Sequence, residues 1–260
     1  MFKITTWNVN SLKVRLPQVL AWLESNRPDV LVLQETKLTD ENFPQVEIEA
    51  AGYHVTFSGQ KTYNGVATLS RLPQHDISLD LPHFDDPQRR VLATSIGTWR
   101  VVNVYVPNGS SVDSDKYEYK LAWLAALEAF IASELAKHPH LILLGDFNIA
   151  PDDRDVHDPK VWEGAVLVSP AERAALSRLF AQGLHDTFRL HSSESGIFSW
   201  WDYRSAAFRR NLGLRIDLIL ASEALKDQCV NTEIDKTARK AERPSDHAPV
   251  TAMFQSSGST

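Results

Sequence analysis

The chain has 260 residues, of which 43% are hydrophobic and 23% are charged, the balance of an ordinary globular protein. The net charge is −6, with 33 acidic against 27 basic residues, which argues against a protein held to nucleic acid mainly by bulk positive charge. A single cysteine, Cys229, excludes an intrachain disulfide and a CxxC zinc or redox site, and it favours the reducing cytoplasm. We expect neither a signal peptide nor a membrane segment, because no apolar run approaches the roughly 20 residues that cross a bilayer.

Short apolar, β-branched runs recur along the chain and have the length and composition of strands buried in sheets. They occupy residues 2–7, 30–33, 66–69, 101–106, 141–144, 216–220 and 250–254. Between them, residues 117–135 carry leucine and isoleucine at spacings of three and four, which predicts an amphipathic helix. Another helix is predicted to begin after Ser169, because Pro170 suits the first turn and Glu172 completes a capping box. Strands interspersed with helices predict an α/β fold, although the pattern leaves the strand order open.

The chain has no internal sequence boundary. Neither a glycine- or serine-rich linker, nor a low-complexity run, nor a clear short repeat divides it. We therefore expect a single domain over residues 1–254. The polar residues 255–260 predict a flexible C-terminal tail.

Acids, amides, a tyrosine and a histidine lie near the ends of the predicted strands. Asn8 and Glu35 follow the first two runs, and the other positions are Tyr105, Asn108, Asp146, Asn148, Asp217, Asp246 and His247. Such groups at strand ends of an α/β protein tend to converge on one rim, where active sites form. Each also has an ordinary explanation, as a solvated turn residue, an Asx turn, a helix cap or a core aromatic. A single metal site explains them all together.

Six short motifs surround these residues in a fixed order. They are WNVN at 7–10, LQETK at 33–37, YVPNG at 105–109, GDFN at 145–148, GLRID at 213–217 and SDHAP at 245–249. Together with QRR at 88–90 and SWWDYR at 199–204, they resemble the exonuclease III family and the eukaryotic abasic-site endonucleases, which belong to the endonuclease/exonuclease/phosphatase superfamily. The resemblance runs from Lys3 to about Phe254 and points to the DNA-repair branch.

This resemblance implies a four-layer α/β sandwich, in which two mixed β-sheets pack face to face, helices lie outside and the motifs gather at one edge. It also implies a Mg²⁺-dependent DNA-repair phosphodiesterase, with Mn²⁺ able to substitute. The implied activities are 3′→5′ exonuclease action on double-stranded DNA, incision at abasic sites, and removal of 3′-phosphate or 3′-phosphodiester groups. The implied partner is duplex DNA with an abasic site, a nick or a 3′ end, and we expect a monomer.

The resemblance also assigns roles to the acidic and amide residues. Glu35 is the first choice for a Mg²⁺ ligand, supported by Asn8 and Asp246, since hard oxygen ligands suit Mg²⁺ or Mn²⁺. Asp146 is expected to orient and deprotonate the attacking water. Asn148 is expected to fix Asp146 and to contact phosphate.

His247 and Tyr105 are the remaining catalytic candidates that the resemblance implies. His247 is expected to donate to a phosphate oxygen from one ring nitrogen, while Asp217 holds the other nitrogen. Tyr105 is expected to hydrogen-bond the scissile phosphate or to assist the leaving oxygen. In the family, Asp146, Asn148 and His247 also flank a second metal position, so the choice between one metal and two stays open.

Contacts with DNA are expected from two groups of residues. By resemblance, the candidates for phosphate and backbone contacts are Asn108, Lys13, Arg90, Lys116, Lys120 and Arg204. The family's small apolar pocket for an abasic or flipped-out sugar matches Trp200, Leu214 and Ile216. The segment 161–169 borders this pocket and is shorter than in some relatives. A large side chain in this segment, such as Trp162 or Leu167, is predicted to obstruct the entry of an abasic sugar into the pocket.

Two other functions compete with this interpretation. Another superfamily phosphodiesterase or phosphatase, such as an inositol-phosphate phosphatase or a sphingomyelinase, would share the catalytic core but not the contexts of Arg90, Tyr105 and Trp200. A non-catalytic RNA-binding regulator on the same scaffold would be expected to lose a catalytic acid or His247, and every such group is present. The balance of the exonuclease, abasic-site and 3′-phosphatase activities stays open, because loops determine how DNA is presented.

Overall fold

The computed structural model describes residues 1–255 and contains two six-stranded mixed β-sheets. In spatial order, the strands of the first sheet are β13 (Cys229–Ile234), β14 (Val250–Phe254), β1 (Phe2–Asn8), β2 (Val30–Gln34), β4 (Val66–Ser70) and β3 (His54–Ser58). Those of the second sheet are β5 (Gln74–Ser78), β6 (Val91–Ile96), β7 (Trp99–Tyr105), β8 (Leu141–Asp146), β12 (Asp217–Ser222) and β9 (Leu184–Asp186). Each predicted strand is present, and its bounds differ from the predicted ones by at most two residues.

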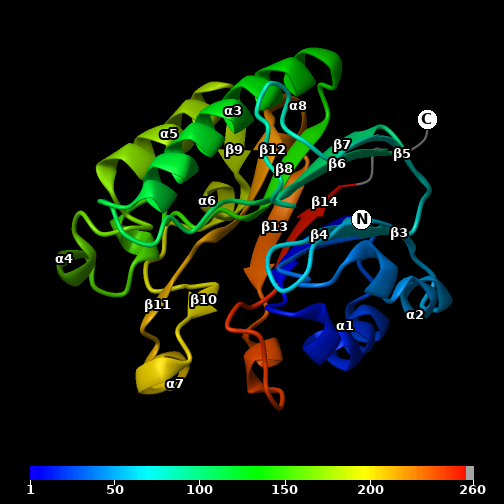
Figure 1. The fold of residues 1–260 in the computed structure, drawn as a ribbon, viewed down its shortest axis with the longest axis horizontal. Coiled ribbons are helices and arrows are strands. Elements are labelled where there is room, and N and C mark those ends of the chain that lie inside the picture. The colour runs from blue at the N-terminus through cyan, green and yellow to red at the C-terminus, as the bar shows by residue number, and fades with distance from the viewer. Residues whose placement is uncertain (256–260) are drawn as a thin grey trace.

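Helices cover the outer faces of the two packed sheets, which gives the molecule four layers (Figure 1). Helices α1 (Leu12–Asn26) and α2 (Gln45–Ala50) pack against the first sheet. Helices α3 (Asp115–Lys137) and α5 (Pro170–Ala181) pack against the second sheet. The four-layer α/β sandwich implied by the resemblance is therefore confirmed.

Alternating side chains of the central strands supply the apolar residues of both sheet faces. In β2, Val30 and Val32 belong to the cluster between the sheets, whereas Leu31 and Leu33 belong to the cluster under α1. Strand β8 alternates in the same way between the inter-sheet cluster and the cluster under α3 and α5. Successive side chains of a strand point to opposite faces, so a strand covered on both sides has a continuous apolar sequence.

The two long helices of the second sheet begin at recognisable caps. Helix α5 has the predicted capping box, in which the Ser169 side chain accepts from the Glu172 amide and the Glu172 side chain accepts from the Ser169 amide. Helix α3 extends two residues beyond each predicted end. It begins at Asp115 because the Ser114 side chain accepts a hydrogen bond from the amide of Tyr117.

Strand register brings the polar motifs to one edge of the sandwich. Strands β1 and β2 are parallel, as are β7 and β8, so the carboxyl ends of each pair lie together. The register places Tyr105 beside Asp146. Strand β12 is antiparallel to β8 and begins with Asp217 opposite Asp146. Groups that are far apart in the sequence therefore lie next to one another.

Polar side chains link the two sheets close to this edge. The side-chain amide of Gln34 in β2 donates to the side-chain oxygen of Asn103 in β7 at 2.9 Å. Asn103 donates in turn to the carbonyl oxygens of Leu33 and Ala67 at 3.1 and 3.0 Å. Both linking side chains are fully buried, so these bonds satisfy them and fix one sheet over the other beside Glu35.

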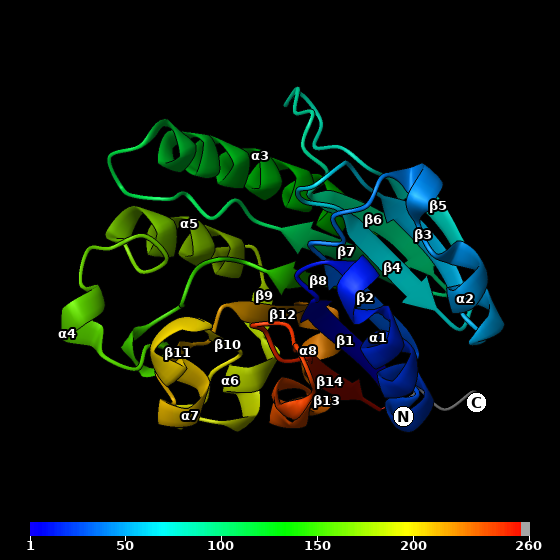
Figure 2. The same cartoon turned by 60° about the horizontal axis from the view of Figure 1, so that its bottom comes forward.

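The remaining elements are short. The helices are α4 (Pro159–Trp162), α6 (Thr187–His191), α7 (Ala207–Arg210) and α8 (Glu223–Lys226), and the 3₁₀ helices are Asp40–Asn42, Asp153–Asp155, Arg204–Ala206 and Lys236–Lys240. Strands β10 (Trp200–Trp201) and β11 (Gly213–Leu214) form a separate hairpin, which lies with α4 and α7 at one end of the molecule (Figure 2). Among residues 1–255, no helix is long and apolar enough to span a membrane. The predicted tail lies outside the described residues except for Gln255.

Candidate active site

Glu35, Asp146 and His247 form a compact group at the edge where the strand ends meet. Their ligand atoms all lie within 4.8 Å of one another. Glu35 directly follows β2, Asp146 ends β8, and His247 lies in the loop before β14. The group thus combines two residues held by the first sheet with one from the second.

Asn8, the last residue of β1, joins the two carboxylates of this group. Its amide nitrogen donates to Glu35 Oε1 and to Asp146 Oδ2, at 2.9 Å in each case. Its amide oxygen accepts from the backbone amide of Asn10 at 3.0 Å. The Ser245 hydroxyl donates to the backbone carbonyl of Asn8 at 2.6 Å, which ties the loop of His247 to the end of β1.

Asp217 orients His247 from the second sheet. The Nδ1 atom of His247 lies 2.9 and 3.1 Å from the two carboxylate oxygens of Asp217, and its Nε2 atom lies 3.6 Å from Asp146 Oδ2. The Ser199 hydroxyl donates to Asp217 Oδ2 at 2.7 Å. Burial by itself would lower the pKa of His247, but the carboxylates of Asp217 and Asp146 raise it to about 10, so the ring is cationic at neutral pH.

Asp146 is held by the turn that follows β8. Burial raises the pKa of its carboxyl to about 7, although the positive charge of His247 opposes this shift. The backbone amide of Asn148 donates to Asp146 Oδ1 at 2.9 Å, and Asn148 adopts a left-handed conformation with φ of 48°. The Asn148 side chain donates to the carbonyl of Val106 at 2.9 Å and accepts from Asn108 at 3.4 Å. These contacts join the turn to the loop after β7.

Glu35 and Tyr105 keep opposite protonation states at neutral pH. Burial opposes ionisation of Glu35, but the hydrogen bond from Asn8 and the charge of Lys37, 3.2 Å away, hold its pKa below the usual value. Burial and the charges of Glu35 and Asp146 raise the pKa of Tyr105 well above its usual range. Tyr105 is therefore a neutral phenol that can donate a proton or a hydrogen bond. The Arg90 guanidinium lies over its ring, 4.7 Å from the centroid.

Asp246 lies outside the compact group, although it neighbours His247 in the sequence. Its Oδ2 atom accepts from the indole nitrogen of Trp200 at 2.9 Å, and its Oδ1 atom accepts from Asn10 at 3.1 Å. The structure therefore brings Asn8 and Glu35 directly to Asp146 and places Asp246 in a neighbouring hydrogen-bonded position.

The donor atoms at this edge fit a hard divalent cation. Two carboxylates lie close together, and oxygen donors of this kind suit Mg²⁺ or Mn²⁺. Buried carboxylates that share one space repel each other, and a cation relieves that repulsion. Glu35 and Asp146 are the residues best placed to hold it, whereas cationic His247 has no free ring nitrogen to offer a metal ion.

Basic residues surround two hollows beside the catalytic group. A hollow of about 550 Å³ next to Tyr105 is lined by Arg90, Lys116 and Asn108, and it also includes Tyr63, which is 67% exposed. A second hollow of about 720 Å³ has Lys13, Lys37 and Lys61 among its lining residues. Arg204 is exposed and paired with Asp202.

Four predicted DNA-contacting residues are buried, namely Arg90, Lys120, Leu214 and Ile216. Arg90 still lines the hollow beside Tyr105, so only the assignments of the other three are corrected. Lys120 is 0% exposed and is paired with Glu172, so it is not a surface cation that reaches the DNA backbone. Leu214 and Ile216 are 0% and 1% exposed, so they do not line an open pocket. The partner of Lys120 could not be identified from local sequence, because Glu172 lies 52 residues away.

The apolar pocket expected beside the catalytic group is occupied by the protein itself. Leu167 packs in one cluster with Leu214 and Ile216, and Trp162 and Trp200 pack against that cluster. Leu167 is 5% exposed and has a φ of 79°, a left-handed conformation that is rare for leucine. The backbone amide of Ala150 donates to its carbonyl at 2.8 Å, which fixes the segment against the turn after β8.

Three residues of the site were not among the predicted ones. Asn10 and Ser199 hold Asp246 and Asp217 respectively, and both stand inside motifs that were recognised. Their position in the recognised motifs could therefore have identified them as residues of the site. Tyr63 lies in a loop without such a motif, and only its exposed aromatic side chain distinguishes it.

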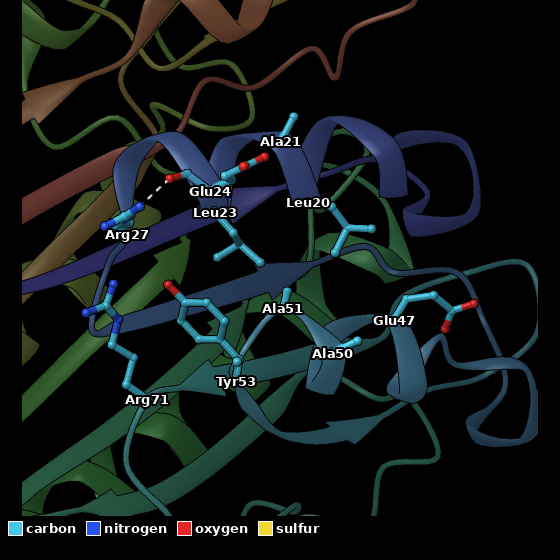
Figure 3. Close-up of a pocket in the computed structure, with 11 residues that line it drawn as sticks. Leu20, Ala21, Leu23, Glu24, Arg27, Glu47, Ala50, Ala51, Tyr53 and Arg71 are labelled. Atoms are coloured by element: carbon cyan, nitrogen blue, oxygen red, sulfur yellow. Dashed lines mark hydrogen bonds between the residues drawn. The ribbon is translucent and has the colours of Figure 1, made fainter.

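A further surface hollow lies away from this site. It has a volume of about 870 Å³ and is formed by the end of α1, by α2 and by the residues around Tyr53 and Arg71 (Figure 3). Arg27 and Glu24 belong to its wall. It contains none of the catalytic candidates.

The fold and the acid–histidine group at its edge are those of a phosphodiesterase whose site could hold a metal ion. The chain belongs to the Endonuclease/Exonuclease/phosphatase family, whose model matches residues 5–247. Within this family it is a member of the exonuclease III and abasic-site endonuclease group, and thus a DNA phosphodiesterase of the exodeoxyribonuclease III type.

Particular relatives support this membership. The chain is 39% identical over 266 residues to the exodeoxyribonuclease III of Haemophilus influenzae, covering 97% of this chain and 100% of the relative. The 3′ phosphatase NExo from Neisseria, bound to a product DNA hairpin, superposes with a TM-score of 0.97 at 49% identity and covers 98% of this chain and 100% of its own. An abasic-site (AP) endonuclease from Archaeoglobus fulgidus superposes with a TM-score of 0.95 at 39% identity, with the same coverage.

Proposed function

We propose that this protein is a Mg²⁺-dependent DNA-repair enzyme that acts at 3′ ends of duplex DNA, removing 3′-phosphates and 3′-terminal nucleotides, and that it incises internal abasic sites poorly. The observation that carries this preference is that buried Leu167 packs in one cluster with Leu214 and Ile216. Incision at an internal abasic site requires room for the sugar beyond the scissile phosphate. A terminal 3′-phosphate carries nothing beyond the scissile bond and needs no such room. A 3′-terminal nucleotide is not tethered to further backbone on its 3′ side, so it can lie outside the filled space.

In the proposed reaction, water attacks phosphorus in line with the departing 3′ oxygen. Asp146 orients the water and accepts its proton, and the amide of Asn148 holds the Asp146 carboxylate in place. Cationic His247, fixed by Asp217, donates from Nε2 to a phosphate oxygen on which charge develops. Neutral Tyr105 donates to the phosphate or to the leaving oxygen. The P–O bond breaks and leaves a 3′-hydroxyl.

Glu35 is proposed as the main metal ligand, supported by Asn8 and Asp246, with Mn²⁺ able to replace Mg²⁺. A second cation position would use Asp146 and Asn148, and it would use His247 only with the ring in its neutral form. The bound cation would supply charge neutralisation at the phosphate and at the leaving oxygen. Asn8 contributes by keeping the Glu35 and Asp146 carboxylates close together.

The proposed DNA contacts follow the basic residues around the two hollows. Lys13, Arg90, Lys116 and Asn108 line these hollows and would contact phosphates of the bound DNA. Arg204 is a further candidate on the opposite side, near the β10–β11 hairpin. The relative NExo is described as a 3′ phosphatase and is bound to a DNA hairpin, which supports both the substrate class and the preference for 3′ ends.

Three labelled duplexes test this proposal: one with a 3′-phosphate at a nick, one with a recessed 3′ end, and one with an internal abasic-site analogue. Each is incubated with Mg²⁺, with Mn²⁺ and with EDTA, beside the Asp146→Asn variant. We expect metal-dependent product from the first two duplexes, much slower incision of the third, and no product with the variant. Faster incision of the abasic duplex would refute the 3′-end preference, and no cleavage of any duplex would refute the nuclease assignment.

A further inference from the structure

Lys120 is buried in α3, and its ammonium group meets three acceptors. It donates to the carbonyl oxygen of Asn108 at 3.1 Å, to that of Asn148 at 2.6 Å, and to the carboxylate of Glu172. An ammonium group has three N–H donors, so these contacts use all of them. Lys120 therefore joins the two loops that carry the catalytic groups, residues 106–110 and 146–150.

Glu172 is also fully buried, and its contacts exceed those of a helix cap. It accepts from the amide of Ser169 at 3.2 Å, a bond of the capping box, and from the Ser169 hydroxyl at 2.6 Å. It accepts in addition from the amide of Leu167 at 3.0 Å. The Tyr117 hydroxyl, on α3 near Lys120, meets the Ser169 hydroxyl at 2.6 Å. Glu172 therefore holds the segment that fills the apolar pocket.

The loop after β7, helix α3 and the segment around Leu167 are also held together by close packing. Gly109, in the loop after β7, lies so close to α3 and to the pocket segment that an added Cβ atom would stand 3.1 Å from both Lys120 and Val166. Its φ of 95° also disfavours any side chain. The loop of Asn108, the helix of Lys120 and the segment of Leu167 are thus in direct contact.

We propose that the buried Lys120–Glu172 ion pair is a positioning unit that holds the two catalytic loops and the pocket segment 165–169 in one fixed relation, and thereby sets the preference for 3′ ends over internal abasic sites. This inference rests on the proposed function. Lys120 acts through the backbones of Asn108 and Asn148, and Glu172 acts through the backbone of Leu167. Neither side chain touches DNA.

A second buried ion pair on the same helix offers a matched control. Arg100 in β7 and Glu134 in α3 are 3% and 5% exposed, and their charged atoms are 2.5 Å apart. Arg100 also donates to the carbonyl of Asp76 and to the hydroxyl of Ser95. The pair is nearly as buried as Lys120–Glu172, whose side chains are both 0% exposed, but it contacts neither the catalytic loops nor the pocket segment.

Single substitutions would leave one buried charge without its partner, which destabilises the fold regardless of function. Replacing both members of a buried pair with apolar residues of similar volume is often well tolerated. The test therefore compares Lys120→Met/Glu172→Met with Arg100→Met/Glu134→Met. A second variant, Lys120→Met/Glu172→Gln, keeps an oxygen acceptor for the first turn of α5 and decides the question if the first variant does not fold.

The measurement is kcat and KM with Mg²⁺ on the nicked 3′-phosphate duplex and on the internal abasic-site duplex. In the Lys120/Glu172 variants we expect kcat on the 3′-phosphate to fall at least about tenfold with KM within about threefold, because misplaced catalytic groups slow chemistry more than binding. The ratio of abasic-site incision to 3′-phosphate release should rise at least about tenfold, since Leu167 loses its anchor. The Arg100/Glu134 control should keep the wild-type ratio.

A folded Lys120/Glu172 variant with the wild-type ratio overturns the inference. Equal losses on both substrates overturn it as well, because they indicate a merely structural pair. Thermal unfolding followed by circular dichroism identifies which variants are folded. If the wild-type enzyme itself prefers the abasic duplex, the proposed function fails, while a change in the ratio from its wild-type value still tests the ion pair.

Discussion

The catalytic group and the apolar pocket beside it lie at the same edge of the molecule but are built differently. The catalytic residues stand at or next to the ends of strands, where register fixes them, as with Asp217 opposite Asp146. The pocket is closed by Leu167, which lies in a segment without regular structure before α5. Sheet register therefore positions the candidate catalytic residues, whereas the packing of one loop side chain, Leu167, is the feature that we propose selects the DNA substrate.

The same difference explains which parts of the site the sequence predicted. A strand covered on both faces is a continuous apolar run, so its end and the polar residue that follows, such as Glu35 or Asp146, can be located directly. The recognised motifs then supplied the order of these residues. The strand order and the short strands β3, β5 and β9 depend on pairing between distant segments, which a local pattern does not encode.

The prediction failed where burial depends on a partner far away in the sequence. Lys120 was expected at the surface because lysine is rarely buried without a partner, and Glu172 is contributed by another helix. Leu214 and Ile216 were expected to line a pocket that Leu167 fills. Neither the left-handed conformation of Leu167 nor its packing follows from local sequence preference.

The largest expected effect comes from removing the base at the strand end. Asp146→Asn keeps the shape of the side chain but cannot accept a proton from water, so we expect activity to fall at least about 10³-fold on every duplex. Initial rates with Mg²⁺ measure this loss, and circular dichroism checks that the variant is folded. Retention of more than a tenth of the activity would show that Asp146 is not the base.

A smaller loss is expected when His247 loses its anionic partner. Asp217→Asn removes the carboxylate that stabilises the cationic ring, so we expect kcat to fall about 10²-fold on both the 3′-phosphate and the abasic duplex. Ser199→Ala removes only one hydrogen bond to Asp217 and serves as the graded control. It should lower kcat about tenfold or less. Equal effects of the two variants would contradict the assigned role.

Opening the pocket should change substrate choice rather than chemistry. Leu167→Gly removes the side chain that fills the space and suits the backbone φ of 79°, so we expect the ratio of abasic-site incision to 3′-phosphate release to rise about tenfold. Val161→Gly, at an exposed position of the nearby helix α4, should leave the ratio unchanged. An unchanged ratio in Leu167→Gly would undermine the pocket-filling explanation.

The smallest effect is expected from a single basic residue at the edge of the hollow. Lys116→Ala should weaken duplex binding about threefold and reduce the slope of log K against log salt concentration by about one, because one phosphate contact is lost. Lys137→Ala, at the other end of α3, is the control and should change neither quantity. Binding titrations at several salt concentrations measure both. Identical salt slopes for wild type and Lys116→Ala would exclude the contact.

The link between Gln34 and Asn103 has a consequence for how activity should respond to partial unfolding. Asn8, Glu35 and His247 are carried by the first sheet, whereas Tyr105, Asp146 and Asp217 are carried by the second. Neither sheet carries the complete set of candidate catalytic residues, so catalysis requires the two sheets to stay packed against each other. Enzymatic activity therefore reports whether the two sheets are packed together, and we expect mild denaturant to abolish activity before the individual strands unfold.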